Sequence, residues 1–306
     1  MVPSGHQVEL AHADQRATVV EVGGGLRTYT VGDLQVLDGY DVGEMCHDGR
    51  GQVLAPWPNR LARGHYRLGG GEHQTPISEP DRGNAIHGLV RWTAWRVVDR
   101  SGDRATMGTV LRPQPGYPFT LMLTVEYSLG DEGLRVSTSA TNIGDGSLPF
   151  GLGFHPYLHP SLTVDSPVDD VVLKVPADTL VETNDSGIPT GVTTAVDGTS
   201  FDLRAGAPIA DRQLDNCFTG LQRDADGLAR ATLASADGSA RLTLWADAAF
   251  GYLMVFTGDT LAPERRRRSV AIEPMTCPPD AFNSGTDLVV LDPESSLTAE
   301  WGISPT

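Results

Sequence analysis

The stretch TLMLTVEYSLGDEGLRVSTSATNIG, residues 120–144, carries the clearest structural pattern in the chain. Its first half places apolar side chains at every second position, at Leu121, Leu123, Val125, Tyr127 and Leu129. Because successive side chains of a strand point to opposite faces, this alternation predicts a strand with one buried face. The segment GDEG then turns the chain into a second alternating run. The stretch therefore predicts an antiparallel hairpin.

The same pattern recurs along the chain. In RATLASADGSARLTLWAD, residues 230–247, Asp237 and Gly238 supply a turn dipeptide between two alternating runs. Further strands are expected at 17–22, 34–40, 65–70, 92–99, 171–176, 252–258, 269–274 and 297–303. With 35 Gly and 21 Pro, few windows allow three uninterrupted helical turns. Segment 189–200 is expected to form a long exposed loop.

These short strands with turn signals and without intervening helices predict an all-β fold, an antiparallel β-sandwich. The chain shows no linker, composition shift or fixed-period repeat, so we expect one domain over residues 1–306 and no propeller or solenoid. A composition of 40% hydrophobic and 20% charged residues suits a globular core.

The charge balance restricts the partners. Lys and Arg total 23 against 39 Asp and Glu, and the formal charge of -16 repels nucleic acid and anionic lipid. The basic segment ERRRRS, residues 264–269, is expected to be a solvated loop. We therefore expect no nucleic-acid or membrane partner.

The cysteines and the amino terminus indicate the compartment. Cys46, Cys217 and Cys277 are odd in number and widely spaced, which favours reduced thiols. The first residues lack the basic start and apolar run of a signal peptide. A cytoplasmic location is the expectation.

The segment GLGFHPYLH, residues 151–159, places His155 in an apolar, glycine-rich run before a proline. The proline biases His155 toward extended backbone, so its imidazole is expected to be held in place. A buried imidazole can serve as a proton donor beside a carboxylate, or it can be a core histidine bonded to a backbone carbonyl. A metal pair of His155 with His159 is disfavoured, because the prolines prevent the helix that would bring them together.

The segment SVAIEPMTCPPDAFNSG supplies a candidate partner. Glu273 follows the apolar run 270–272, so a carboxylate is expected at the end of a buried strand. Burial of a charge is costly without a partner or a chemical task. The alternative is an acid at a strand end that faces water.

Three further segments contain candidate ligand-binding groups. Asn59 and Arg60 lie in a proline-bounded turn, where Arg60 either fixes a ligand oxygen or forms an ordinary ion pair. His87 follows a short apolar run. Considered by itself, it is expected to have a structural role. Asp215 lies in a short polar segment, and a β-turn would also explain this segment.

The order of these segments is more specific than any one of them. PWPNRLARGHYRLGGGEHQ, NAIHGLVRWTAW, FGLGFHPYL, LDNCF and AIEPMTCPPDAFNSG, taken together, resemble the aldose 1-epimerase family, also called galactose mutarotases. The resemblance runs from about residue 50 to the carboxyl terminus and includes the closing AEWGI. In galactose-specific members the later histidine is followed by a tyrosine and FNL. HPYL here places the chain nearer a divergent bacterial branch.

The resemblance implies a galactose mutarotase-like supersandwich with an open sugar cleft and a cofactor-independent isomerase. It implies that Glu273 is the catalytic base and His155 the catalytic acid. His87, Asp215 and the Asn59–Arg60 pair would bind the sugar. A monosaccharide is the expected partner, with no metal and no cofactor, and the chain would act as a monomer or homodimer.

The expected chemistry interconverts α and β anomers. A base removes the proton of the C1 hydroxyl while an acid protonates the ring oxygen, and the ring recloses on the other face. At reference pKa values near 4.3 and 6.5, glutamate would be ionised and histidine could be protonated. Two alternatives remain: a glycoside-cleaving enzyme that uses Asp215 and Glu273, and a sugar-binding or sensing module without turnover.

Overall fold

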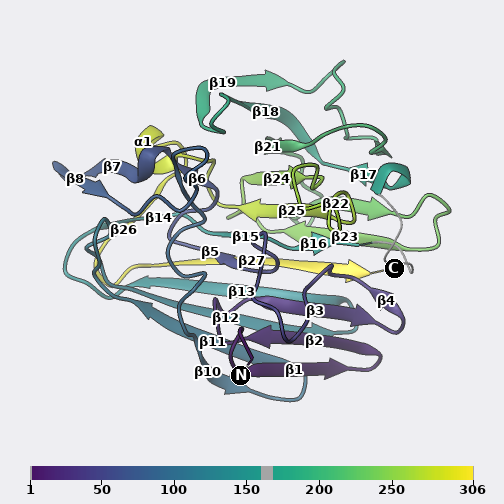
Figure 1. Cartoon of the computed structure of the whole chain (residues 1–306), viewed down its shortest axis with the longest axis horizontal. Coiled ribbons are helices and arrows are strands. Elements are labelled where there is room, and N and C mark those ends of the chain that lie inside the picture. Colours follow the sequence, from purple (N-terminus) through teal and green to yellow (C-terminus); the bar gives the residue numbers. More distant parts are fainter. Residues whose placement is uncertain (1, 160–167, 306) are drawn as a thin grey trace.

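The computed structural model describes residues 2–159 and 168–305, and antiparallel sheets form most of this part of the chain (Figure 1). Helical turns in the described residues are confined to α1 (Ala281–Ser284) and two 3-10 turns, η1 (Ala62–Gly64) and η2 (Val168–Asp170). The prediction of an all-β fold is confirmed.

Two large sheets form the body of the molecule. The first has nine strands in the order β10 (Arg96–Arg100), β11 (Arg104–Leu111), β12 (Leu121–Gly130), β13 (Gly133–Asn142), β27 (Ser296–Pro305), β23 (Arg241–Ala246), β22 (Ala229–Ala234), β17 (Val172–Lys174) and β20 (Ala207–Pro208). The second has eight strands, in the order β19 (Pro189–Ala195), β18 (Ala177–Thr183), β21 (Asp215–Leu221), β24 (Tyr252–Phe256), β25 (Val270–Met275), β15 (Gly153–Phe154) and β5 (Val53–Leu54), with β16 (Tyr157–Leu158) paired to β25.

Smaller sheets flank these two. A four-stranded sheet contains β1 (Gln7–His12), β2 (Gln15–Val20), β3 (Leu26–Val31) and β4 (Leu34–Gln35). Three two-stranded sheets pair β14 (Leu148–Phe150) with β26 (Val289–Leu291), β6 (Arg60–Leu61) with β9 (Ala85–Ile86), and β7 (His65–Leu68) with β8 (Gly71–Gln74). The hydroxyl of Tyr127 on β12 donates to the carbonyl oxygen of Gly24 at 2.7 Å, which ties the four-stranded sheet to the nine-stranded one.

Both predicted hairpins form. In β12 and β13, Leu121 lies opposite Asn142 and Gly130 opposite Gly133, and the alternate positions of β12 that begin at Leu121 are buried. The second hairpin joins β22 to β23 through a turn in which Gly238 has φ +73°. The alternation predicts these elements because one face of each strand packs on the core.

The two large sheets share a hydrophobic core. Phe154 of β15 contacts Trp301 of β27 with ring centroids 5.1 Å apart, and Phe154 also contacts Phe250 at 6.4 Å. One continuous cluster of buried apolar side chains includes residues of both sheets. The strands that carry the functional candidates, β25 and the β15–β16 segment, are therefore held on a packed layer.

Two local predictions were wrong. Segment 189–200 is not a loop throughout, because β19 covers residues 189–195 and pairs with β18 at the sheet edge. Its side chains are mostly exposed, so the sequence lacks the apolar alternation of a half-buried strand. In segment 34–40 only the two residues of β4 form a strand.

No helix among the described residues is long and apolar enough to span a membrane.

Candidate active site

Glu273 lies within a fully buried strand. All six residues of β25 are buried, and Glu273 is only 2% exposed. The register places Cys217 of β21, Met254 of β24 and Glu273 side by side across three strands. Because laterally paired residues share one face of a sheet, Glu273 points to the same face as its partners. The alternative of an acid facing water is excluded for this residue.

His155 is held by the loop that precedes β5. Its backbone N–H donates to the carbonyl oxygen of Gln52 at 3.2 Å, and its carbonyl oxygen accepts from the N–H of Gly51 at 2.9 Å. The ring is packed against Gly49, where an added Cβ would lie 2.8 Å from Cδ2 of His155. The ring of Tyr157 also stacks on the His155 ring, with centroids 4.9 Å apart and 17° between planes. The imidazole is therefore confined, as the sequence predicts.

The two candidates converge although 118 positions separate them in the sequence. Nε2 of His155 lies 3.4 Å from Oε1 of Glu273. Oε2 of Glu273 and Nδ1 of His155 are buried and have no hydrogen-bond partner among the described residues. A buried polar atom is usually satisfied, and its exceptions concentrate at chemically active sites.

Burial changes which group holds a proton. Burial, with the charges of Arg50 and Arg91, lowers the pKa of His155 to about 3. Burial, with the negative charge of Asp215, raises the pKa of Glu273 well above its ordinary value, while Arg60 opposes the rise. Both shifts run against an ionised glutamate beside a protonated histidine in the free site. Desolvation favours one proton on the pair, carried by the carboxyl group.

His87 completes the buried cluster. Its ring meets that of His155 edge-on, with centroids 5.2 Å apart and 74° between planes. It lies at φ +62°, and the following Gly88 approaches Ala55 so closely that an added Cβ would lie 2.0 Å from the carbonyl oxygen of Ala55. Burial, Arg91, His155 and Arg60 together lower the pKa of His87 well below its usual range. A purely structural role does not explain why its Nδ1 has no hydrogen-bond partner.

Asn59 and Arg60 lie beside this cluster and are nearly buried. The N–H of His87 donates to the carbonyl oxygen of Asn59 at 2.8 Å, so the two segments are tied together. Arg60 forms a two-pronged ion pair with Glu79, with Nε to Oε2 at 2.9 Å and Nη2 to Oε1 at 3.0 Å. The guanidinium is thus an ion-pair partner and also part of the cleft lining.

These residues surround a cleft of about 420 Å³, a size typical of small-molecule sites. Asp215 is the exposed first residue of β21, so the alternative of a β-turn is wrong, and Arg82 lies 3.7 Å from its carboxylate. All six residues singled out from the sequence line this cleft: Asn59, Arg60, His87, His155, Asp215 and Glu273.

Other lining residues escaped the sequence analysis. Arg91 and Trp92 follow His87 by four and five positions, and Trp92 is 52% exposed at the cleft. The tryptophan that follows an arginine in GLVRWTAW is a sequence signal that could have identified both as cleft residues. Glu79, Asp48 and Phe256 have no comparable local signal, because tertiary contacts alone bring them to the cleft.

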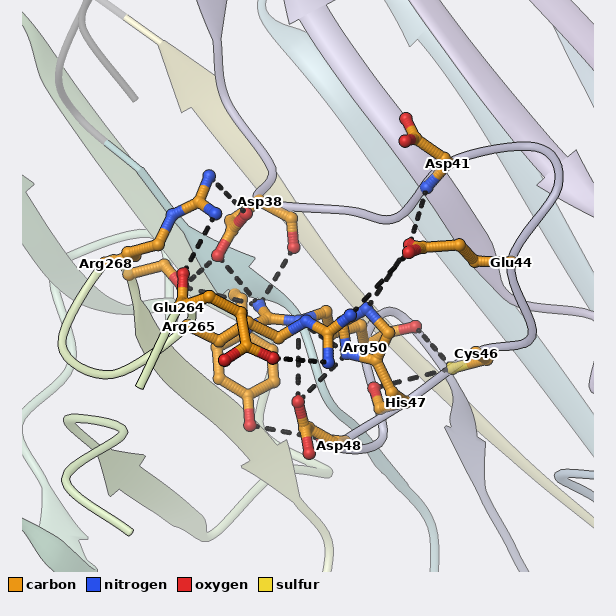
Figure 2. A network of polar contacts seen from close by, with 12 residues as sticks. Asp38, Asp41, Glu44, Cys46, His47, Asp48, Arg50, Glu264, Arg265 and Arg268 are labelled. Atoms are coloured by element: carbon orange, nitrogen blue, oxygen red, sulfur yellow. Dashed lines mark hydrogen bonds and ion pairs between the residues drawn. The ribbon is translucent and has the colours of Figure 1, made fainter. Parts of the chain in front are cut away.

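Arg50 lies at the centre of a second charged cluster, which includes Asp38, Asp48 and Arg268 (Figure 2). The guanidinium of Arg50 is 4.0 Å from the centroid of the Tyr157 ring, and Arg50 is 2% exposed. Its Nη1 donates to Oδ2 of Asp38 at 2.9 Å, and Ser269 donates to the same oxygen at 2.6 Å. Nη2 of Arg268 lies 3.9 Å from the other Asp38 oxygen. The end of segment 264–269, expected to be solvated, thus reaches a buried network.

A slightly larger hollow, about 520 Å³, lies at the turn between β12 and β13. Its two arginines form ion pairs, Arg135 with Glu300 at 2.5 Å and Arg230 with Asp224 at 2.7 Å. None of its titratable lining residues is buried, in contrast to the cleft at Glu273.

The cleft also contains groups of the kind that bind metals. A ring nitrogen from each of His87 and His155 and a carboxylate oxygen of Glu273 lie within 4.8 Å of one another. In the described residues, His155 therefore groups with His87 and Glu273, whereas the sequence analysis considered it with His159.

Comparison with known proteins identifies the family of the chain. The family model described as Aldose 1-epimerase matches residues 6–304. The chain is 36% identical over 290 residues to the uncharacterized protein YihR of Escherichia coli K12, covering 94% of this chain and 90% of that protein. It is 29% identical over 160 residues to human galactose mutarotase, covering 50% of this chain and 45% of the relative.

The fold is also that of solved structures. A GalM/aldose epimerase homologue from C. elegans superposes with a TM-score of 0.87 at 20% identity, covering 98% of each chain. The antiparallel supersandwich and the family resemblance predicted from the sequence are thereby confirmed. This chain belongs to the aldose 1-epimerase family.

Proposed function

We propose that this protein is an aldose 1-epimerase, which interconverts the α and β anomers of a free hexose by opening and reclosing the sugar ring. The observation that carries the proposal is the 3.4 Å contact between Nε2 of His155 and Oε1 of Glu273 in the cleft. The C1 hydroxyl and the ring oxygen are bonded to the same carbon of the sugar. Two proton-transfer groups must therefore lie close together to reach both.

In the proposed mechanism Glu273 takes the proton of the C1 hydroxyl while His155 protonates the ring oxygen. The C1–ring oxygen bond breaks, C1 becomes an aldehyde, and rotation about the C1–C2 bond presents its other face. Reclosure returns both protons along the same route in reverse. Electron pairs and protons balance within the sugar and the two side chains, so the residues need no further reactant.

The reaction requires one proton on the pair, and the free site favours its location on Glu273. Transfer across the 3.4 Å contact gives the carboxylate and imidazolium that the mechanism uses. The charge of Arg60 favours this transfer because it stabilises the carboxylate. The neutral pair also avoids the cost of burying two uncompensated ions in the free enzyme.

The neighbouring residues are proposed to bind the sugar. Arg60 and Asn59 supply donors on one side of the cleft, and the exposed Asp215 supplies an acceptor on another. His87, kept neutral, can donate or accept a hydrogen bond at a sugar hydroxyl. Their orientation of the sugar would contribute to catalysis by fixing the reacting oxygens near the proton-transfer pair.

The test is polarimetry on freshly dissolved α-glucose, α-galactose and a panel of other aldoses. The purified chain should accelerate the approach to the equilibrium rotation for at least one hexose. The panel identifies the preferred sugar.

Two other activities give different results in the same assays. Hydrolysis of a nitrophenyl glycoside, abolished by Asp215→Asn, would replace the proposal by a glycosidase. Sugar binding by calorimetry without faster mutarotation of any bound sugar would replace it by a binding module.

A further inference from the structure

We infer that His87, His155 and Glu273 form a binding site for a divalent ion of the zinc type, and that an ion bound there stops catalysis. The inhibitory half of this inference rests on the proposed mutarotase function, whereas metal binding itself does not.

The spacing of the atoms suits zinc. Zinc binds histidine nitrogen and carboxylate oxygen at about 2.0–2.2 Å, so two ligands in a tetrahedral site lie roughly 3.4 Å apart. Nε2 of His155 and Oε1 of Glu273 are separated by 3.4 Å. The His87 nitrogen lies within 4.8 Å of a ligand atom of each, so a movement of at most roughly 1.4 Å toward them completes the site.

The ligand atoms are available. Glu273, His155 and His87 are 2%, 5% and 7% exposed. Nε2 of His155 and Oε1 of Glu273 face each other, and among the described residues Nδ1 of His87 and Oε2 of Glu273 have no hydrogen-bond partner. A metal ion would therefore replace one direct contact and release the proton of the pair. Two histidines and one glutamate, with a fourth position open to the cleft, is a ligand set that zinc accepts.

The charges around the cluster are mixed. Beside Glu273, the cleft lining contains the acidic side chains of Asp48, Glu79, Asp81 and Asp215 and the guanidiniums of Arg60, Arg82 and Arg91. Glu79 pairs with Arg60, and Asp215 lies 3.7 Å from Arg82, which offsets two of the three positive charges.

The expected consequence is reversible inhibition. The ion occupies the lone pairs of Glu273 and His155 that must accept and deliver protons, and it fills the floor of the cleft. Zinc and sugar should therefore compete for the free enzyme. Magnesium, which prefers oxygen ligands, should bind far more weakly.

The test uses the full chain, freed of metal with EDTA and dialysed, and titrated with zinc chloride by calorimetry. We expect one zinc ion per chain at the cleft. His155→Asn and Glu273→Gln should each weaken binding at least tenfold, since the loss even of groups that only support a ligand costs about 10–100-fold. In polarimetry zinc should raise the apparent KM without changing kcat, and EDTA should restore the rate.

The matched control is His12→Asn. Nε2 of His12 lies 2.7 Å from Asp131, outside the cleft, so it is also a close histidine–carboxylate pair. Zinc affinity should be unchanged in this variant. Affinity that survives in both His155→Asn and Glu273→Gln, or that is lost in His12→Asn, overturns the site.

Metal binding and inhibition of catalysis can be contradicted by different results. Zinc binding that depends on His155 and Glu273 in a chain with no mutarotase activity would overturn the proposed function and the inhibition but not the site. Full activity of the zinc-saturated enzyme would overturn the inhibition alone.

Discussion

Two buried acids, Glu273 and Asp38, differ in the partners that the fold gives them. Asp38 accepts hydrogen bonds from Arg50 at 2.9 Å and Ser269 at 2.6 Å (Figure 2). Glu273 has His155 at 3.4 Å, and among the described residues its second oxygen has no hydrogen-bond partner. Both residues are nearly inaccessible to solvent, Asp38 at 7% and Glu273 at 2% exposed.

The difference separates structural from chemical use of a buried charge. Partners for Asp38 and Arg50 compensate the cost of removing both ions from water. Glu273 lacks the same compensation, and burial raises its pKa, which fits the proposed role of a group that holds and releases a proton. Tyr157, which stacks on His155 and lies against Arg50, connects the two clusters.

Removal of the proton-transfer groups should have the largest effect. Glu273→Gln and His155→Asn are each expected to lower the mutarotation rate by about 10²–10⁴-fold, because each removes one proton-transfer step. The fold should persist in both, since neither variant breaks a satisfied ion pair. Polarimetry with thermal unfolding measures both quantities, and an unchanged rate in the two variants would remove the mechanism.

Removal of the partnered acid should instead reduce stability. Asp38→Ala leaves Arg50 buried without its carboxylate, so the free energy of unfolding should fall by about 3–5 kcal/mol. The rate per folded molecule should change less than tenfold, because Asp38 does not line the cleft. Urea unfolding and active-site-normalised polarimetry give the two values. A full loss of rate with intact stability would mean that the two clusters do not have separate roles.

The pH dependence of the free energy of unfolding should reveal the raised pKa of Glu273. Because the folded state holds the Glu273 proton more tightly than the unfolded state, ionisation of Glu273 opposes folding. The contribution of this proton is present at low pH and is lost as pH rises above the unfolded pKa toward the raised folded value. The stability difference between Glu273→Gln and the unmodified chain should therefore grow with pH in that window. Urea unfolding of both proteins in a buffer with EDTA measures this difference at each pH. A stability difference that does not change with pH would contradict the raised pKa of Glu273.

The smallest effect is expected from the hydroxyl of Tyr157, which donates to the carbonyl oxygen of Asp48 at 3.1 Å. Tyr157→Phe keeps the ring between His155 and Arg50 and should cost about 0.5–1.5 kcal/mol of stability with little change in rate. Tyr157→Leu removes the stacked ring and should lower the rate further than Tyr157→Phe. Equal rates in the two variants would show that the stack does not position His155.

The sequence by itself determined the β-rich class and both hairpins, because strand alternation and turn residues act over a few positions. The order of five short motifs also determined the family and the six candidate residues that line the cleft. The signals for Arg50 and Asp38 were too weak to be noticed, since an arginine and an aspartate in a loop are usually exposed.

Only the tertiary structure decided how these groups act. Sheet register places Glu273 on the cleft face, and the loop at Gly49 confines His155 beside it. Pairing with β18 made residues 189–195 a strand despite their polar side chains. The protonation of the pair follows from desolvation, which depends on what surrounds a side chain in space. Local sequence cannot specify that surrounding, because residues far apart in the chain provide it.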